Sequence, residues 1–515
     1  MIQIIDCGSQ LTQNIARRVR DLGVFAEILP FHIPVEKVLA SKPQGLIISG
    51  GPFSVYDEGS PLYAKAILES GLPILGICYG LQSMSYLLGG KVLATNKREY
   101  GETHIQVEKE SPLFANISKG EHRVWMSHGD IVESIPEGFE IIARSESGHV
   151  AAMQKKDVTT GKRVHQVYAV QFHPEVDHTD CGQQLLDNFL NICEAQRLWD
   201  ATKEYDRLVE ETREQLRGKV GIGGISGGVD SSTLSVLLGQ IAGKDYHPIF
   251  VDNGVLRANE AQEVRKFLDP FNLNVQYVDA SERFLNKLKG VRDPDQKRVI
   301  IGHEFIEVFE EEARKIPNVS YLAQGTLYPD VIESVPVYGA SSKIKRHHNV
   351  GGLPEKMELE VVEPFRHLFK DEVRAIAEQK LGMPKEVVWR HPFPGPGLAV
   401  RIIGEITPRK LEVVRQADAI FLEELRKRDL YDKISQGFAV LTDIHSIGVM
   451  GDAGTYEGII GLRAVTTNDY MTADWFDFDG RDLRKIVNRI INEVPGVNRV
   501  VYDISQKPPS TIEWE

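Results

Sequence analysis

Short apolar strands that alternate with amphipathic segments restrict this chain to a small set of folds. Four runs in the first third have the length and apolar content of buried strands: 2–6, 45–49, 73–77 and 164–171. Helical patterns follow two of them, at 10–22 and 81–88. This rhythm predicts an α/β domain around a largely parallel sheet.

The same rhythm starts again after a charged stretch at 198–216, which we expect to be a helical linker between domains. Further strands are expected at 220–225, 248–251, 275–278 and 321–323, with a helix at 231–241. A second doubly wound α/β domain follows from this pattern.

A segment rich in proline and glycine, His-Pro-Phe-Pro-Gly-Pro-Gly at 391–397, interrupts the pattern. It can continue neither a helix nor a central strand, because proline lacks an amide donor and fixes the backbone. Beyond it we expect a small α+β domain, with helices at 410–427 and 481–493 and strands at 438–442, 458–466 and 497–504. The predicted domains are therefore 1–195, 196–390 and 391–515.

The bulk composition excludes several classes of protein. The chain has 515 residues and a formal net charge of −13, so we expect no nucleic-acid partner. No apolar run approaches the ~20 residues of a membrane helix, and the first residues lack the basic region of a signal peptide. The four cysteines form no CxxC pair, which favours a reducing cytoplasm over a disulfide framework or a structural zinc site.

A cysteine stands at the most informative turn of the first domain. Cys78 follows the apolar run 73–77 and precedes a helical pattern, with Gly76 and Gly80 on either side. Small neighbours permit the strained turn of a nucleophile elbow, and the positive end of the helix favours a thiolate. At the end of another strand, His173 supplies a base and Glu175 a group that orients it.

The turn Ser-Gly-Gly-Pro at 49–52 follows a third strand, and the amides of Gly50, Gly51 and Tyr79 are candidate oxyanion donors. Each feature alone is common without catalysis, since a buried cysteine is usually a small hydrophobe. Together, Ser-Gly-Gly-Pro, Gly-Ile-Cys-Tyr-Gly-Leu-Gln and Gln-Phe-His-Pro-Glu resemble the signature segments of the class I (triad-type) glutamine amidotransferases. The resemblance implies that Cys78 forms a glutamyl thioester and releases ammonia. It also implies a set of glutamine-binding residues: Gln82, Ser127, His128, Gly129 and Asp130.

A second glycine-rich turn, Gly-Gly-Ile-Ser-Gly-Gly-Val-Asp-Ser-Ser at 223–232, follows the strand 220–225 and opens a helix. Glycines let backbone amides approach an anion, the serines add hydroxyl donors, and the helix N-terminus adds its dipole. The turn lacks the Gly-Lys-Ser/Thr ending of a Walker A loop and is not a GxGxxG fingerprint. It resembles the PP-loop of the N-type ATP pyrophosphatases, which cleave ATP between its α and β phosphates.

This second resemblance implies the fold of the adenine nucleotide α-hydrolases, with ATP bound together with Mg²⁺. The implied ATP-binding residues lie in the loop and on the next strand: Ser226, Gly227, Gly228, Val229, Asp230, Ser231, Ser232, Val251 and Asp252. We expect no metal site made of protein ligands alone. Mg²⁺ is expected on the ATP phosphates, with Asp230 as a candidate protein ligand.

Four further segments bear on the acceptor of the ammonia. They are Gly-Thr-Leu-Tyr-Pro-Asp at 325–330, a basic loop at 343–354 that could close as a lid, the boundary at 390–398 and the tail at 507–515. With the two turns, they resemble the glutamine-hydrolysing GMP synthases of the bacterial two-activity type over essentially the whole chain. The resemblance implies that ATP adenylates xanthosine 5′-monophosphate (XMP), that ammonia from L-glutamine converts it to GMP, and that the C-terminal domain forms a homodimer.

The resemblance also implies residues for XMP binding and for the lid: Arg298, Asp330, Lys345, His347, His348, Lys507, Thr511, Ile512 and Glu513. Lys507 is the clearest phosphate partner among them. One departure is Arg346, where many relatives are expected to have serine, so the role of Arg346 is open.

Two alternative functions remain open at this point. Another PP-loop amidotransferase, such as an NAD⁺ synthetase, would not need the tail at 507–515, and an asparagine synthetase is excluded because residue 2 is isoleucine instead of the required cysteine. A non-catalytic sensor of glutamine or nucleotides would keep the folds but would have no use for a poised cysteine.

Overall fold

The computed structural model describes residues 1–156, 166–334, 359–450, 453–467, 470 and 472–515. These residues form two compact units, the first made of residues 1–203 and 329–334 and the second of residues 204–328 and 359–515. No helix in the described part of the chain is long and apolar enough to cross a membrane.

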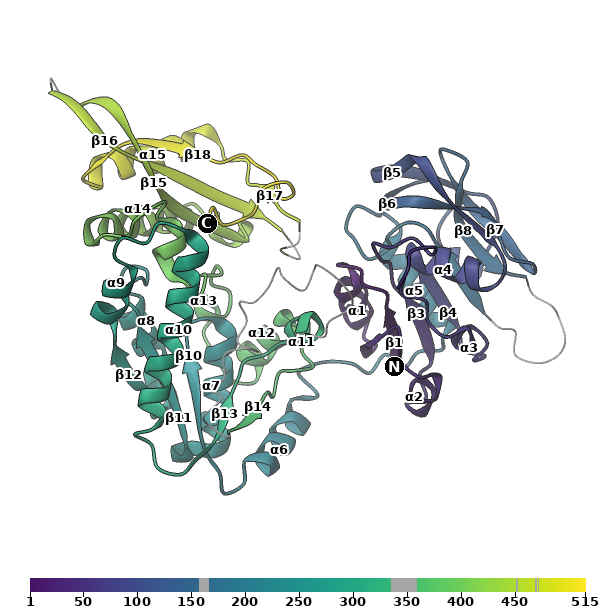
Figure 1. Cartoon of the computed structure of the whole chain (residues 1–515), viewed down its shortest axis with the longest axis horizontal. Coiled ribbons are helices and arrows are strands. Elements are labelled where there is room, and N and C mark those ends of the chain that lie inside the picture. The colour runs from purple at the N-terminus through teal and green to yellow at the C-terminus, as the bar shows by residue number, and fades with distance from the viewer. Residues whose placement is uncertain (157–165, 335–358, 451–452, 468–469, 471) are drawn as a thin grey trace. The chain divides into compact units, whose positions relative to one another are not determined.

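The first unit is built on a mixed nine-stranded sheet (Figure 1). Its parallel half, in spatial order, consists of β2 (Ala26–Pro30), β1 (Ile2–Asp6), β3 (Gly45–Ile48), β4 (Ile74–Ile77) and β9 (Val167–Val170). The sheet continues with four antiparallel strands: β8 (Val150–Lys155), β7 (Phe139–Ser145), β5 (Lys91–Val107) and β6 (Gly120–Ser134). The α/β class is confirmed, but the largely parallel sheet predicted for this unit describes only five of its nine strands.

Burial explains why one half of this sheet was predicted and the other was not. Every residue of β1, β3, β4 and β9 is buried, as expected for strands covered on both faces. In β6, by contrast, buried and partly exposed residues are mixed, so its sequence lacks a continuous apolar run. The helices of the unit are α1 (Thr12–Asp21), α2 (Val35–Ala40), α3 (Lys65–Leu68), α4 (Tyr79–Leu87) and α5 (Gly182–Ile192).

The second unit contains a parallel five-stranded sheet (Figure 1). Its strands, in spatial order, are β12 (Gln276–Asp279), β11 (Tyr246–Asp252), β10 (Val220–Ile225), β13 (Val319–Ala323) and β14 (Glu360–Val362). The strand order reverses direction at β10, which is therefore the switch point where doubly wound sheets bind ligands.

The helices of this α/β part are α6 (Tyr205–Leu216), α7 (Val229–Ala242), α8 (Glu260–Leu268), α9 (Ser281–Leu288), α10 (Pro294–Ala313), α12 (Lys370–Gln379) and α13 (Lys385–Val388). A further helix, α11 (Tyr328–Ser334), begins at Tyr328 of this unit, and its residues 329–334 belong to the first unit. The helix predicted at 198–216 is shorter than expected, because it begins only at Tyr205. Helix α7 packs against β10 and α10 against β11.

The C-terminal part of the second unit is a four-stranded sheet covered by two helices. It contains α14 (Pro408–Lys427), β15 (Gln436–Met450), β16 (Ala453–Thr466), β17 (Asp474–Trp475), α15 (Gly480–Glu493) and β18 (Val497–Tyr502). Helix α14 packs on β15, α15 packs on β18, and the two helices pack on each other. One apolar core runs from Ile222 and Val251 to Leu398 and Ile460, so residues on both sides of the expected boundary at 391 share it.

Gly221 on β10 shows how tightly this core is packed. A Cβ atom at this position would fall inside the ring of Tyr321 on β13, whose side chain is fully buried. We expect Gly221→Ala to lower the free energy of unfolding by roughly 1–3 kcal/mol, as overpacked cores do. Urea unfolding would measure the loss. As a control, Gly302→Ala in α10 adds a methyl group to open space and should leave stability unchanged or raise it by up to ~1 kcal/mol. Equal stability of the two variants would contradict this packing argument.

Candidate active sites

Cys78 lies at the sharp junction between β4 and α4. Its backbone has φ +53° and ψ −105°, a conformation that residues other than glycine rarely adopt. The junction is possible because its neighbours are glycines: a Cβ atom at Gly80 would overlap the carbonyl oxygen of Ile48, and one at Gly76 would lie 2.8 Å from the Gly80 carbonyl oxygen. The strained turn places the thiol at the N-terminus of α4, as in a nucleophile elbow.

His173 and Glu175 form a buried pair beside this cysteine. Nδ1 of His173 donates a hydrogen bond to Oε1 of Glu175 at 2.7 Å, and both side chains are almost fully buried. The backbone of His173 is fixed as well, because its amide donates to the Trp125 carbonyl and its own carbonyl accepts from Thr179 Oγ1. Burial of the ring opposes its charged form, but the carboxylate of Glu175 and the sulfur of Cys78 outweigh burial and raise the pKa of His173 well above 6.5.

Two side chains and one carbonyl surround the sulfur and the start of α4. Nε2 of Gln171 lies 3.7 Å from Sγ of Cys78, and Sγ lies 3.6 Å from the carbonyl oxygen of Ser127. Nε2 of Gln82 donates to the carbonyl of Asp130 at 3.0 Å. Gln171 was missed as a site residue in the sequence. Its position two residues before His173 was the available signal, since alternate residues of an extended segment point to the same side.

The turn after β3 brings its backbone to the cysteine. A Cβ atom at Gly50 would lie 3.2 Å from Cε1 of His173 and 3.6 Å from Cβ of Cys78, and one at Gly51 would lie 2.5 Å from the carbonyl oxygen of Cys7. The backbone therefore runs closer to the reactive groups than most side chains would allow. The amide of Tyr79 belongs to the first turn of α4, where backbone donors have no partner within the helix. These amides are where an oxyanion hole is expected.

Asp130 has an unusual carboxylate. Its backbone carbonyl accepts from both Gln82 and Nδ1 of His128, while its Oδ2 atom is buried without a hydrogen-bond partner in the described part of the chain. His128 is held from its other side by Glu99, 3.0 Å away. Burial would raise the pKa of Glu99, but hydrogen bonds from His128 and from two serines lower it to about 2. Gly129 between His128 and Asp130 has only the Tyr100 hydroxyl near its missing Cβ.

The second predicted site lies between β10 and α7. The hydroxyl groups of Ser226 and Ser231 are hydrogen-bonded to each other across the turn at 3.1 Å. The amide of Gly228 donates to Oγ of Ser226 at 3.3 Å. Gly227 has φ +76°, and a Cβ atom there would lie 2.8 Å from Cγ2 of Val264. Val229 begins α7 immediately afterwards. The turn thus offers amides, hydroxyls and a helix N-terminus to an anion, at the switch point of the sheet.

Two polar atoms near the start of α7 are buried without a hydrogen-bond partner among the residues described: Oδ1 of Asp230 and Oγ of Ser232. The other carboxylate oxygen of Asp230 lies 3.3 Å from Nζ of Lys370, the first residue of α12. An unpartnered carboxylate oxygen beside an anion cradle suits Mg²⁺, which prefers oxygen ligands and phosphate groups. Lys370 could not be predicted from the sequence, because it lies about 140 residues from the loop and no motif links them.

The end of β11 lies beside this turn in the sheet. Val251 is buried in the apolar core, and Oδ1 of Asp252 accepts from the amide of Gly254 at 2.9 Å. Arg390 holds the backbone of the turn. Its NH1 donates to the carbonyl of Gly227 at 2.8 Å, and its NH2 pairs with Glu260 at 2.5 Å.

The C-terminal tail is ordered by polar contacts. Nζ of Lys507 donates to the carbonyl of Tyr470 at 2.7 Å, and its backbone pairs with Ala473 in both directions. Glu513 forms a two-pronged ion pair with Arg401 at 2.8 and 3.1 Å. Ile512 is buried in a small apolar core with Phe438, Val440, Val465 and Ala473. The backbone carbonyl of Thr511 accepts a hydrogen bond from Arg463.

Arg298, Asp330 and the lid residues are the remaining predicted site residues. Arg298 pairs with Asp295 on its own helix at 3.3 Å, although the preceding residue, Lys297, contacts the C-terminal Glu515. Asp330 lies in α11. The lid residues Lys345, His347 and His348, like Arg346, lie outside the described residues.

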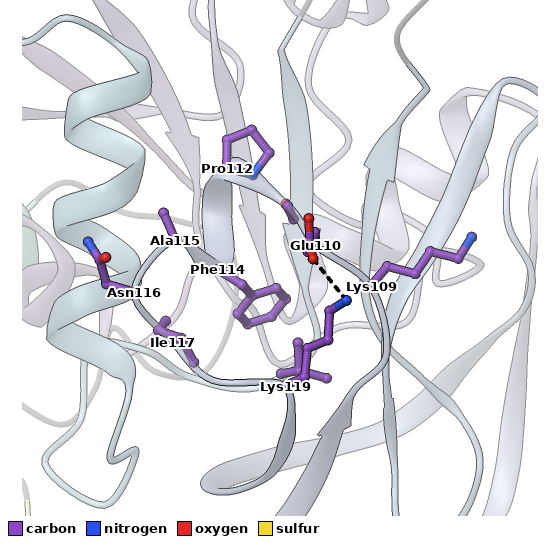
Figure 2. A pocket seen from close by; sticks show the side chains of 10 residues that line it. Lys109, Glu110, Pro112, Phe114, Ala115, Asn116, Ile117 and Lys119 are labelled. Carbon is purple, nitrogen blue, oxygen red and sulfur yellow. Dashed lines mark hydrogen bonds and ion pairs between the residues drawn. The ribbon is translucent and has the colours of Figure 1, made fainter.

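A hollow of about 650 Å³ on the first unit lies apart from these residues (Figure 2). Its rim includes Lys109 and Lys119, which pair with Glu140 and Glu110 respectively. None of its lining residues was predicted as a site residue, and its cations are already neutralised, so it gives no indication of a ligand.

Comparisons with known proteins identify the family of the chain. Residues 3–193 match the model of the class-I glutamine amidotransferase family, and residues 423–514 match the model of the GMP synthase C-terminal domain. Curated proteins called GMP synthase [glutamine-hydrolyzing] from Brachyspira hyodysenteriae and Aquifex aeolicus are each 52% identical to the chain, over 100% of its length and 99% of theirs. A protein of the same name from Nitratidesulfovibrio vulgaris is also 52% identical, over 99% of this chain and 98% of its own. The chain belongs to the glutamine-hydrolysing GMP synthase family.

This membership confirms the resemblance that the sequence motifs indicated. The alternative of an NAD⁺ synthetase finds no support, because the match to these GMP synthases extends through the C-terminal region that distinguished it. The alternative of a non-catalytic sensor finds no support either, because these curated relatives are glutamine-hydrolysing GMP synthases.

The ion pair of His173 and Glu175 makes a pH-dependent contribution to stability. Because the folded-state pKa of His173 is raised above 6.5, this contribution is fully present below about pH 6.5 and is lost as the pH rises through the folded-state pKa. We therefore expect Glu175→Gln to cost more unfolding free energy at about pH 6 than at an alkaline pH above the folded-state pKa of His173. Urea titrations at the two pH values would measure this. Glu69→Gln, an exposed carboxylate of the same unit, is the control; an equal cost of Glu175→Gln at both pH values would contradict the assignment.

Proposed function

We propose that this chain makes GMP by transferring ammonia from L-glutamine to XMP that it has activated with ATP. The products are GMP, L-glutamate, AMP and pyrophosphate. The observation that carries the proposal is the presence, in one chain of this family, of a strained cysteine with a buried His–Glu pair and of a separate glycine-rich anion cradle.

In the glutaminase reaction, Sγ of Cys78 attacks the amide carbon of glutamine. The resulting oxyanion is stabilised by backbone amides near Gly50, Gly51 and Tyr79. His173, held protonated by Glu175, gives a proton to the departing ammonia, and water then hydrolyses the thioester. The free Oδ2 atom of Asp130 suits the α-ammonium group of glutamine.

In the synthetase reaction, the turn 226–232 holds the phosphates of ATP. Lys370 and the serine hydroxyls donate to phosphate oxygens, and β11 with Val251 and Asp252 borders the nucleotide. Asp230 would hold Mg²⁺ through its unpartnered oxygen. When bound, Mg²⁺ neutralises the charge that develops on the departing pyrophosphate.

The acceptor is assigned to the C-terminal tail. We propose that Lys507 binds the phosphate of XMP, with Thr511, Ile512 and Glu513 bordering the nucleotide and Arg298 assisting. Asp330 and the lid residues Lys345, His347 and His348 are proposed to assist adenylation. The domain boundaries at 195 and 390 belong to the same proposal, as does a cytoplasmic location, which fits the four unpaired thiols.

Replacing the nucleophile separates the two reactions. We expect Cys78→Ala to reduce glutamine-driven GMP formation by at least about a thousandfold, because nothing else can form the thioester. Formation of GMP from XMP, ATP and ammonium salt should stay within about twofold, since free ammonia replaces the missing product. Assays of AMP release and GMP formation with each nitrogen source measure both.

The matched control is Cys181→Ala, a buried thiol at the start of α5 whose pKa burial raises to about 11. It should retain both activities. Loss of ammonia-driven activity in a folded Cys78→Ala protein would refute the division of labour, and a wild-type protein that aminates no XMP would refute the acceptor.

We further propose that the hairpin of β15 and β16 forms the homodimer. Ile447 and Val449 point to the same face of β15, and Tyr456 lies opposite Ile447 in the register. These three side chains are 78%, 76% and 71% exposed, which is unusual for a contiguous apolar strip. Figure 1 shows the end of this hairpin extending past the helices that cover the rest of its sheet.

A charge on this strip should weaken the dimer. We expect Ile447→Glu to raise the dimer dissociation constant by roughly tenfold or more, because an unpaired carboxylate would be buried at the interface. Sedimentation equilibrium would measure the change. Leu198→Glu, at a similarly exposed apolar residue of the first unit, should leave the dissociation constant unchanged. A monomeric wild-type protein, or a dimer that ignores the substitution at Ile447, would refute the proposal.

A further inference from the structure

A row of buried charges runs through the second unit from the phosphate-binding turn to the C-terminal tail. It begins at Arg390, which holds the carbonyl of Gly227 and pairs with Glu260. The side chain of Glu260 is 2% exposed, and its second oxygen accepts from the backbone amide of Arg257 at 3.1 Å. The carboxylate of Glu260 thus joins the turn after β10 to the segment after β11.

The opposite end of the row holds the tail. Arg401, which is fully buried, donates twice to Glu513, and Gln436 on β15 donates to the same carboxylate at 2.7 Å. Burial opposes the charge of Arg401, but Glu513 and Asp418 outweigh it and hold the pKa of Arg401 above its ordinary value. Glu513 is therefore fixed by groups outside the tail itself.

Asp418 on α14 connects the two ends. One oxygen lies 3.2 Å from Nε of Arg257 and the other 3.8 Å from NH1 of Arg401, and the Asp418 side chain is 2% exposed. Both guanidinium groups also lie over the ring of Phe393, at 4.5 and 5.2 Å from its centroid. The segment rich in proline and glycine thus provides the apolar face against which the two arginines are stacked.

The side chains of Glu260, Asp418 and Arg401 are buried, where an unpaired charge is costly. Displacement of one partner is therefore expected to disturb its neighbours. No polar group of Glu260 or Asp418 reaches the proposed ligand residues directly; each acts through an arginine.

We propose that Glu260 and Asp418 are positioning residues for the adenylation of XMP. They hold the phosphate-binding turn and the acceptor-binding tail at a fixed position relative to each other. This inference rests on the proposed function, because it takes ATP to bind at the turn and XMP at the tail. In-line attack needs the acceptor oxygen and the α-phosphate of ATP to be aligned. A change in the relative position of the turn and the tail therefore slows the chemical step even when both nucleotides bind.

The test uses the full chain with ammonium salt as nitrogen donor, so that glutamine hydrolysis has no part in the rate. Glu260→Gln and Asp418→Asn remove each charge while keeping the shape, and asparagine can still accept from the amide of Ala439. We expect each variant to lower kcat about tenfold, the size of coupling found within one ion-pair network. Glu260→Gln should also raise the KM for XMP, although the two partners of the Glu260 side chain, Arg390 and the amide of Arg257, lie outside the tail.

The double variant decides between positioning and simple damage. If both residues act through one row of charges, Glu260→Gln combined with Asp418→Asn should be about as slow as the slower single variant. The control is Glu424→Gln, which removes an equally buried carboxylate of α14 from its pairs with Arg428 and Arg489, outside the row. It should lower the melting temperature to a similar extent and leave kcat and both KM values within about twofold.

Multiplied losses in the double variant, or an equal loss of kcat in Glu424→Gln, would overturn the positioning role. Either result, obtained beside a wild-type protein that forms GMP from XMP, would leave the proposed function intact. Failure of the wild-type protein to release AMP with XMP would instead refute the proposed function, and with it the roles given to Glu260 and Asp418.

Discussion

Both candidate sites depend on turns at the ends of parallel strands where a Cβ atom has no room. At Gly80 such an atom would overlap the Ile48 carbonyl, and at Gly227 it would press on Val264. Because the side chains are missing, helices can begin directly at the sheet edge, and their free amides face the space where a ligand binds. The thiol of Cys78 and the hydroxyls of the second turn take their positions from this backbone constraint.

Buried charge is the second organising principle, and it is used differently in the two units. In the first, a single His–Glu pair is placed against a sulfur, so its charge serves the chemistry directly. In the second, the carboxylates of Glu260 and Asp418 are surrounded by arginines and lie away from the reacting groups. Both arrangements remain charged only because each carboxylate is matched by a cation, since desolvation would otherwise favour the neutral forms.

Much of the fold could be predicted because local composition was enough. The strands β1, β4 and β10 are short, mostly apolar or glycine segments, and α14 and α15 have clear helical spacing. The antiparallel half of the first sheet could not be found in this way, because strands such as β6 mix buried with partly exposed residues. The helix expected from residue 198 begins only at Tyr205.

The sequence by itself determined which groups are present and in what local setting: a cysteine between glycines at a strand end, a His-Pro-Glu segment, and a glycine-serine turn before a helix. These motifs are local, so neighbouring residues in the chain are sufficient to define them. Only the tertiary structure decided which distant groups meet them. Gln171 at Cys78, Lys370 at Asp230 and Arg401 at Glu513 come together because sheets and buried ion pairs join segments far apart in sequence, and no local pattern encodes that pairing.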